Sequence, residues 1–174
     1  PYEGEDRAGS VRVLQYLNGS WASLGQDILT DQAGSWFGFE VALSSDGSIL
    51  TVGAPRHDID GAEVGEVKVY QLSENNWSQL GQSINGGPDE KFGSSLSISS
   101  DGLTLAIGAP FHETDRGRVG VFQFTGNSWD LLDDYLIGYG QSGTTLDMSS
   151  DGRILAIGSP HNGINGRRSG RVQV

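Results

Sequence analysis

The sequence has no cysteine and few basic residues. With no thiol among its 174 residues, neither a disulfide framework nor a thiolate site is available. Eleven Lys and Arg stand against 22 Asp and Glu, and the resulting net charge of −11 repels nucleic acid. No apolar run approaches the roughly 20 residues of a membrane-spanning helix, so this segment is not expected to insert into a membrane. Its glycine-rich stretches follow no strand-then-helix pattern, so no nucleotide or other cofactor is predicted.

What the sequence does have is one unit of about fifty residues that recurs. A Ser-Asp-Gly motif returns at Asp46, Asp101 and Asp151, so the spacing is 55 residues and then 50. Each copy is followed by a motif of small residues that ends in proline: Gly53-Ala54-Pro55, Gly108-Ala109-Pro110 and Gly158-Ser159-Pro160. Self-similarity at such a period is typical of propellers and solenoids.

Each unit holds four short apolar runs of strand length. In one unit the runs cover residues 37–44, 49–52, 67–72 and 77–80. The first alternates with the two-residue period of a strand, and no segment keeps a helical period. Four strands in a period near fifty residues form one propeller blade. We therefore predict an all-β fold made of β-propeller blades of four antiparallel strands, with about three repeats of 50–56 residues.

The order of the motifs also divides the chain. We predict one β-propeller domain, with a partial blade at residues 1–36, blades at 37–91 and 92–141, and a partial blade at 142–174. Both ends of the sequence fall inside a unit, and closed propellers have about four to eight blades. We therefore expect these residues to form an open segment of a larger propeller.

The set of motifs resembles the FG-GAP repeats of integrin α-subunit heads and other surface proteins. The resemblance covers essentially the whole chain and is closest to a secreted variant with the motifs W-x-Q-L-G, F-G-x-S, S-x-D-G and A-I-G-A-P. These motifs stand here at Trp77–Gly81, Phe92–Ser95, Ser99–Gly102 and Ala106–Pro110. The resemblance implies a non-enzymatic, extracellular or cell-surface module that mediates protein–protein adhesion or the assembly of a larger surface structure.

One feature of that family is not carried over, namely calcium binding between the first two strands. Many members have a D-x-D-x-D-G loop there, whereas the Ser-Ser-Asp-Gly turn of this chain is too short to supply six or more oxygen ligands. Asp-Gly between two strands is instead a strong hairpin signal. The segment from Asp58 to Gly61 begins like a calcium loop but lacks a carboxylate at its far end, so no metal site is predicted.

Loops that differ between units predict the binding surface. Antiparallel order places six connections on one face: 26–36, 56–64, 82–91, 111–116, 133–141 and 161–169. Variable loops on a rigid β scaffold usually carry specificity, and by the resemblance this face meets a protein partner or another component of an assembly. The candidate binding residues are Arg56, His57, Asp58, Phe111, His112 and Glu113. The histidines are expected to be solvated loop residues rather than catalytic groups.

The opposite face carries two glycosylation sequons, at Asn18 and Asn76, both just before a tryptophan-bearing strand. Two sequons at equivalent turns favour a secreted, exposed surface. The tryptophans of these strands, Trp21, Trp77 and Trp129, are predicted to fill the widening space between neighbouring blades.

The alternative function is a carbohydrate-binding or carbohydrate-active propeller, with a polysaccharide as partner. A lectin would be expected to repeat an aromatic and a carboxylate in each blade. Only one such group occurs: Trp129, Asp130, Asp133, Asp134 and Tyr135. An enzyme would need a polar cluster near the axis, and on the first strands Glu40 and Asp147 are the acidic candidates.

Overall fold

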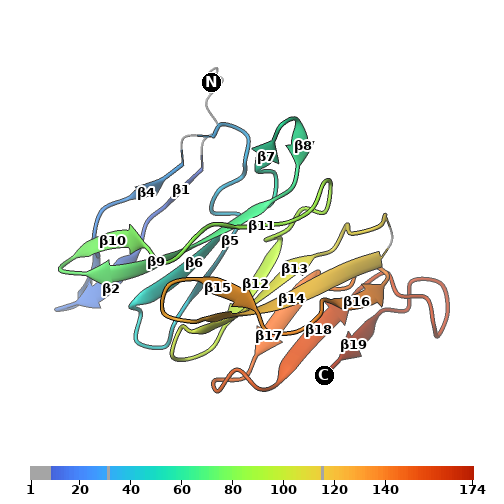
Figure 1. Ribbon diagram of the computed structural model, residues 1–174. Helices are drawn as coiled ribbons and strands as arrows, with labels where there is room; N and C mark the ends of the chain where they lie inside the picture. Colours follow the sequence, from blue (N-terminus) through green and yellow to red (C-terminus); the bar gives the residue numbers. More distant parts are fainter. Residues whose placement is uncertain (1–8, 31, 115) are drawn as a thin grey trace.

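Every regular element of the described residues is a β-strand (Figure 1). The structure is a computed structural model that describes residues 9–30, 32–114 and 116–174. The predicted all-β class is therefore confirmed for the described residues. They contain no helix of the length and apolar character needed to cross a membrane.

Two sheets share one antiparallel strand order. In the first, the strands are hydrogen-bonded in the order β5 (Glu40–Leu43), β6 (Ile49–Ala54), β9 (Glu66–Ser73) and β10 (Asn76–Gln79), and β11 (Ile84–Asn85) also pairs with β9. In the second the order is β12 (Ser95–Ile98), β13 (Thr104–Ala109), β14 (Arg116–Phe124) and β15 (Trp129–Leu131), and β16 (Leu136–Tyr139) also pairs with β14. Each repeat thus folds into its own sheet.

Smaller sheets flank these two. Before them, β1 (Ser10–Val11) pairs with β4 (Ile28–Leu29), and β2 (Leu14–Leu17) pairs with β3 (Ser20–Ser23). After them come β17 (Thr145–Met148), β18 (Leu155–Ser159) and β19 (Arg171–Gln173), and a small hairpin joins β7 (Asp58–Ile59) to β8 (Ala62–Glu63). The sheets follow one another in chain order, from the blue β1–β4 pair to the red sheet of β17 to β19 (Figure 1).

Strand boundaries differ from the sequence-based expectation in two ways. The first apolar run was expected to be extended from Phe37, but β5 begins only at Glu40 because Gly38 adopts a φ of +86° in a turn. Segments 82–91 and 133–141, expected as loops, contain β11 and β16. The reason is that β9 and β14 are longer than the fourth strands beside them, so each pairs with two partners along its length.

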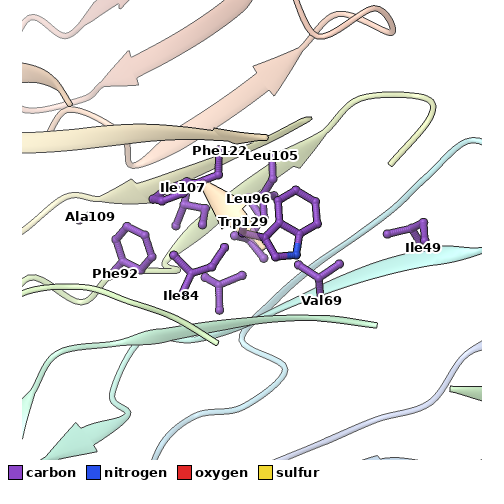
Figure 2. Packing of buried hydrophobic residues seen from close by; sticks show 11 residues of the cluster. Ile49, Val69, Ile84, Phe92, Leu96, Leu105, Ile107, Ala109, Phe122 and Trp129 are labelled. Atoms are coloured by element: carbon purple, nitrogen blue, oxygen red, sulfur yellow. The ribbon is translucent and has the colours of Figure 1, made fainter. Parts of the chain in front are cut away.

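The hydrophobic core lies between successive sheets. One cluster lies between the first and the second sheet and contains residues of both. Trp129, Phe92, Val69 and Ile84 all belong to it (Figure 2). Two further clusters fill the preceding and the following interfaces. Every residue of β6 is buried: Ile49 enters the first cluster, and Leu50, Val52 and Ala54 enter the preceding one. Burial on both faces explains why this run is almost continuously apolar.

A tryptophan of each complete unit is held by the unit before it. The Trp77 indole N–H donates to the carbonyl of Leu24 at 2.8 Å, and the Gln26 amide bonds both the N–H and the C=O of Trp77, at 2.9 and 2.8 Å. Leu80 and Gln82 hold Trp129 in the same way. We call this arrangement the glutamine clasp.

The clasp explains which tryptophans are buried. Trp77 and Trp129 are 4% and 3% exposed, as predicted. Trp21 is 67% exposed, so the prediction that it is buried is wrong. No glutamine of the described residues clasps the strand that carries it.

The sequence position of the clasp glutamine occurs a third time in the chain. There Asp134 replaces the glutamine of the first two copies.

Glycine allows the sheets to approach closely near the loop face. A Cβ added to Gly53 would lie 2.2 Å from the carbonyl oxygen of Gly93 in the next unit, and a Cβ on Gly108 would lie equally close to that of Gly143. Both contacts join the Gly-Ala-Pro motif of one unit to the turn before the first strand of the next. Because a real Cβ cannot fit at that distance, the motif requires glycine for packing.

At the opposite face the Ser-Asp-Gly turns hold one another. Within one turn, Asp46 accepts hydrogen bonds from the Ser44 hydroxyl and the Ser48 N–H, at 2.7 and 2.9 Å, while Gly47 takes a φ of +72°. These hydrogen bonds lower the pKa of Asp46 to about 2. Neighbouring turns are joined by the bond from the Ser45 N–H to the Ser100 carbonyl, at 3.1 Å. The recurring aspartates therefore form hairpin turns, as the sequence indicates.

Replacing Trp77 by alanine should lower the free energy of unfolding by about 3–5 kcal/mol, because the change removes a large buried aromatic and the clasp contact. Trp21→Ala is the matched control and should change it by no more than about 0.5 kcal/mol, because that ring is exposed. Denaturant unfolding followed by circular dichroism measures both. Equal losses in the two variants would contradict the burial argument.

Gly53→Ala should destabilise the protein by about 1–3 kcal/mol, because the added methyl group forces the first sheet away from the turn of the next. Gly163→Ala serves as its control, since the nearest atom to an added Cβ there is 3.5 Å away and its backbone is not left-handed. Thermal unfolding of the two variants gives the comparison. A Gly53→Ala protein as stable as Gly163→Ala would show that the close approach is dispensable.

Candidate functional site

Three equivalent turns bring side chains together on the loop face. The residue before each first-strand turn is Trp36, Lys91 or Gln141, and each has left-handed backbone, with φ values of +59°, +52° and +58°. Positive φ is unfavourable for bulky side chains and is found most often where a function or a tight turn requires it. The close approach at the glycines brings these turns together, and all three side chains line one cavity.

A cavity of about 320 Å³ lies among these turns. We call it the aromatic groove, and its walls are Trp36, Phe39, Pro55, Lys91, Ser94, Pro110, Phe111, Gln141 and Thr144. All three aromatic rings are exposed, by 44% for Trp36, 52% for Phe39 and 38% for Phe111. The Trp36 and Phe39 rings stack, with 5.6 Å between centroids. Exposed aromatic side chains gathered in one hollow are unusual and indicate a binding surface.

Two cations accompany the aromatic rings. The guanidinium of Arg56 lies 4.7 Å from the centroid of Trp36 and is held there by Glu63, at 2.9 Å from Nε and 2.8 Å from Nη2. The ammonium of Lys91 lies 4.6 Å from the centroid of Phe111. These are cation–π contacts, which attract a positive charge to the face of a ring. The groove thus has a lysine in its wall and an arginine at its edge, in a chain whose net charge is −11.

A buried ionic cluster supports the groove beside Lys91. The Glu90 carboxylate lies 2.6 Å from Nδ1 of His112 and 2.6 Å from Nη2 of Arg118, and it accepts the Gly87 N–H at 3.0 Å. Burial raises the pKa of Glu90, but the Gly87 N–H, His112 and Arg118 together outweigh burial and lower that pKa below its usual value. The cluster ties the 82–91 segment to the loop of His112.

The other predicted histidine is also partly buried. His57 Nδ1 lies 3.5 Å from the carboxylate of Glu66, which Lys68 approaches to 3.1 Å. The side chains of His57 and His112 are only 18% and 17% exposed. The expectation of solvated loop histidines is therefore wrong for His57 and His112, whose imidazoles face a carboxylate of their own unit or of the adjoining loop, whereas His161 is exposed as expected.

The remaining predicted residues have local partners. Asp58 accepts the Gly61 N–H at 2.8 Å and thereby closes the hairpin between β7 and β8. Glu113 pairs with Arg116 at 2.6 Å on the exposed rim. Of the six candidates, Arg56 and Phe111 border the aromatic groove.

Sequence reasoning missed Trp36, Lys91 and Gln141. A sequence signal for them exists, since the residue before the turn changes from an aromatic to a cation to an amide in successive units. The candidate binding residues predicted from the sequence all follow the proline motif instead.

The sequons lie away from this groove. Asn18 is in the turn between β2 and β3, and Asn76 opens β10; both are exposed. Neighbouring Asn75 accepts the Gly25 N–H at 3.0 Å. Glycosylation at Asn18 and Asn76 stays a prediction.

The carbohydrate candidates of the sequence do not form an open aromatic site. Trp129 is buried and Asp130 is bonded to Thr125 and Ser128. Tyr135 lies against Arg118, with 3.7 Å between the guanidinium carbon and the ring centroid. Burial raises the pKa of Glu40. In the part of the chain that the structure describes, no three His, Asp or Glu side chains are grouped as metal ligands.

Comparison with known proteins gives a distant similarity. No protein-family model matches the chain. It is similar to integrin α-11 of mouse and of human, with 27% and 28% identity over 129 residues, which is 67% of this chain. The chain spans only 11% of the length of these relatives. The similarity is partial, and it is consistent with a role in adhesion at the cell surface.

Glu90→Gln should reduce both stability and its pH dependence. The lowered pKa means that the Glu90 carboxylate stabilises the fold above its unfolded value near 4.5, and this contribution is lost as the pH falls through the lower folded value. At pH 7 the variant should lose about 1–3 kcal/mol, because Arg118 and His112 lose their charged partner.

The free energy of unfolding, measured from pH 7 to pH 3, tests this expectation. Its fall at acidic pH should be shallower in Glu90→Gln than in the wild type. Glu113→Gln, at an exposed carboxylate, should follow the wild-type curve. A Glu90→Gln curve parallel to the wild type would exclude Glu90 as a source of acid sensitivity.

Proposed function

We propose that this chain is part of an FG-GAP-type β-propeller and acts as a non-enzymatic, extracellular or cell-surface module in protein adhesion or assembly. The observation that carries the proposal is the aromatic groove on the loop face. It is an exposed, cation-bearing hollow built from equivalent positions of successive units. Its aromatic rings are of the type enriched at protein–protein interfaces, and Arg56, another enriched type, lies over the ring of Trp36.

The sheet architecture supports the propeller part of the proposal. Each complete sheet has four strands in sequence order and a short fifth strand, β11 or β16, and each sheet packs its face on the next. On this basis we propose blades at residues 37–91 and 92–141, with partial blades at 1–36 and 142–174. A repeated rigid scaffold with variable loops suits recognition, because binding costs little reorganisation.

The similarity to integrin α-11 supports the adhesion part. A carbohydrate-binding role is the second candidate, and the observation that favours it is the exposed Trp36–Phe39 stack, since aromatic rings also accept sugars. Partner capture from native material, with a protein arm and a polysaccharide arm, separates the two.

The double variant Arg56→Glu with Phe111→Ser should recover at least about tenfold less protein partner, since each change removes a side chain type enriched in interface hot spots. Arg153→Glu with Leu103→Ser makes equivalent changes at exposed positions of the Ser-Asp-Gly turns on the opposite face and should leave recovery unchanged. Pull-down followed by quantitative mass spectrometry gives the readout, with circular dichroism as the folding control. Undiminished recovery by the folded loop-face variant would contradict the proposal.

A further inference from the structure

The aromatic groove has apolar walls and few unused polar groups. Trp36, Phe39 and Phe111 supply rings, and Pro55 and Pro110 add two more apolar surfaces. Both hydroxyl groups in the lining are occupied by main chain: Ser94 Oγ donates to the Lys91 carbonyl and Thr144 Oγ1 donates to the Gln141 carbonyl, each at 2.6 Å. The donors that remain toward an occupant are the Lys91 ammonium and the Gln141 amide.

This donor set is poorly suited to a sugar. A sugar ring needs several free hydrogen-bonding groups for its hydroxyls together with an open aromatic face. Here both hydroxyl groups of the lining are already used by main-chain carbonyls. A chain segment that has apolar rings and offers only acceptors matches the groove better. Proline has these properties, because it carries an apolar ring and a carbonyl but no N–H.

Charge defines the occupant further. Lys91 is the charged residue of the lining, and it forms no ion pair within the described residues. Arg56 lies over the ring of Trp36 but is engaged by Glu63. An occupant with one carboxylate therefore gains an ion pair at Lys91 without displacing an existing one. The cavity of about 320 Å³ is at the small end of binding pockets, so it accommodates one short stretch of chain.

We propose that the aromatic groove binds an extended, proline-containing acidic segment of a partner protein. Its prolines contact the ring surfaces of Trp36, Phe39 and Phe111, and its carboxylate pairs with Lys91. Aromatic grooves take such segments in the polyproline II conformation, which is preformed and loses little entropy on binding. The proposal rests on the proposed function and specifies the chemistry of the partner.

Direct titration of the chain with peptides tests the assignment. The probe is a fluorescein-labelled peptide of eight prolines interrupted by a central glutamate, and its matched forms carry glutamine or lysine instead. Fluorescence anisotropy measures the affinity at low and at high salt. We expect affinity in the order glutamate, glutamine, lysine, with only the glutamate peptide weakened by added salt, because surface ion pairs are screened.

Two variants probe the two halves of the site. Lys91→Gln should weaken the glutamate peptide by about two- to fivefold and make it equal to the glutamine peptide, the size expected for an exposed ion pair. Trp36→Asn should weaken all peptides by about tenfold or more, as for an aromatic hot spot. Asparagine is chosen because it tolerates the left-handed backbone of this position. Arg153→Gln and Trp21→Ala are the matched controls and should bind as the wild type does.

The outcomes separate this proposal from the proposed function. No peptide binding to the wild type, or equal losses in Trp36→Asn and Trp21→Ala, overturns the assignment of a proline-containing ligand. A chitin or hyaluronan hexasaccharide that competes with the peptide, or binds in its place and is lost in Trp36→Asn, overturns it in favour of a sugar. If the peptides fail while Arg56→Glu with Phe111→Ser still loses the native partner, the adhesion function stands and only its chemistry changes.

Discussion

The structure depends on the close contact of one sheet with the next, which the backbone makes possible at two glycines per junction. Gly53 meets Gly93, and Gly108 meets Gly143, at distances that no side chain would permit. The glutamine clasp holds the same junctions at their outer part, where Gln26 and Gln82 fix the strands of Trp77 and Trp129. Burial between the sheets supplies most of the stabilisation, while these polar and backbone contacts set the spacing and register of the sheets.

That register is also what creates the aromatic groove. Because equivalent turns are aligned, the residue before each turn becomes a position on a shared surface, and its identity changes the chemistry of the groove without changing the scaffold. At this position Trp36 contributes an aromatic ring to the groove, Lys91 a cation and Gln141 an amide. The repeat therefore provides shape, and the departures from the repeat provide recognition.

Much of this could be predicted from the sequence because the signals are local. The alternating and continuous apolar runs predict the strands, and the Asp-Gly pairs predict hairpin turns, as at Asp46. The groove could not be found in this way, since Trp36 and Phe111 are 75 residues apart and meet only after two sheets pack. The burial of His112 could not be predicted for a similar reason. Its partner Glu90 lies on a segment whose position depends on the pairing of β11 with β9.

The replacement of glutamine by Asp134 limits the interchange of units. An amide both accepts and donates, so Gln26 and Gln82 each fix the N–H and the C=O of the strand that they hold. A carboxylate can accept the N–H but has no proton for the C=O. The three units are thus not equivalent building blocks. If their order were shuffled, or a copy of one were inserted between the others, an aspartate that bonds only the N–H could replace a glutamine that bonds both the N–H and the C=O. Chimeric arrays of these repeats should therefore be joined so that each tryptophan strand follows a unit that ends in Leu-Gly-Gln.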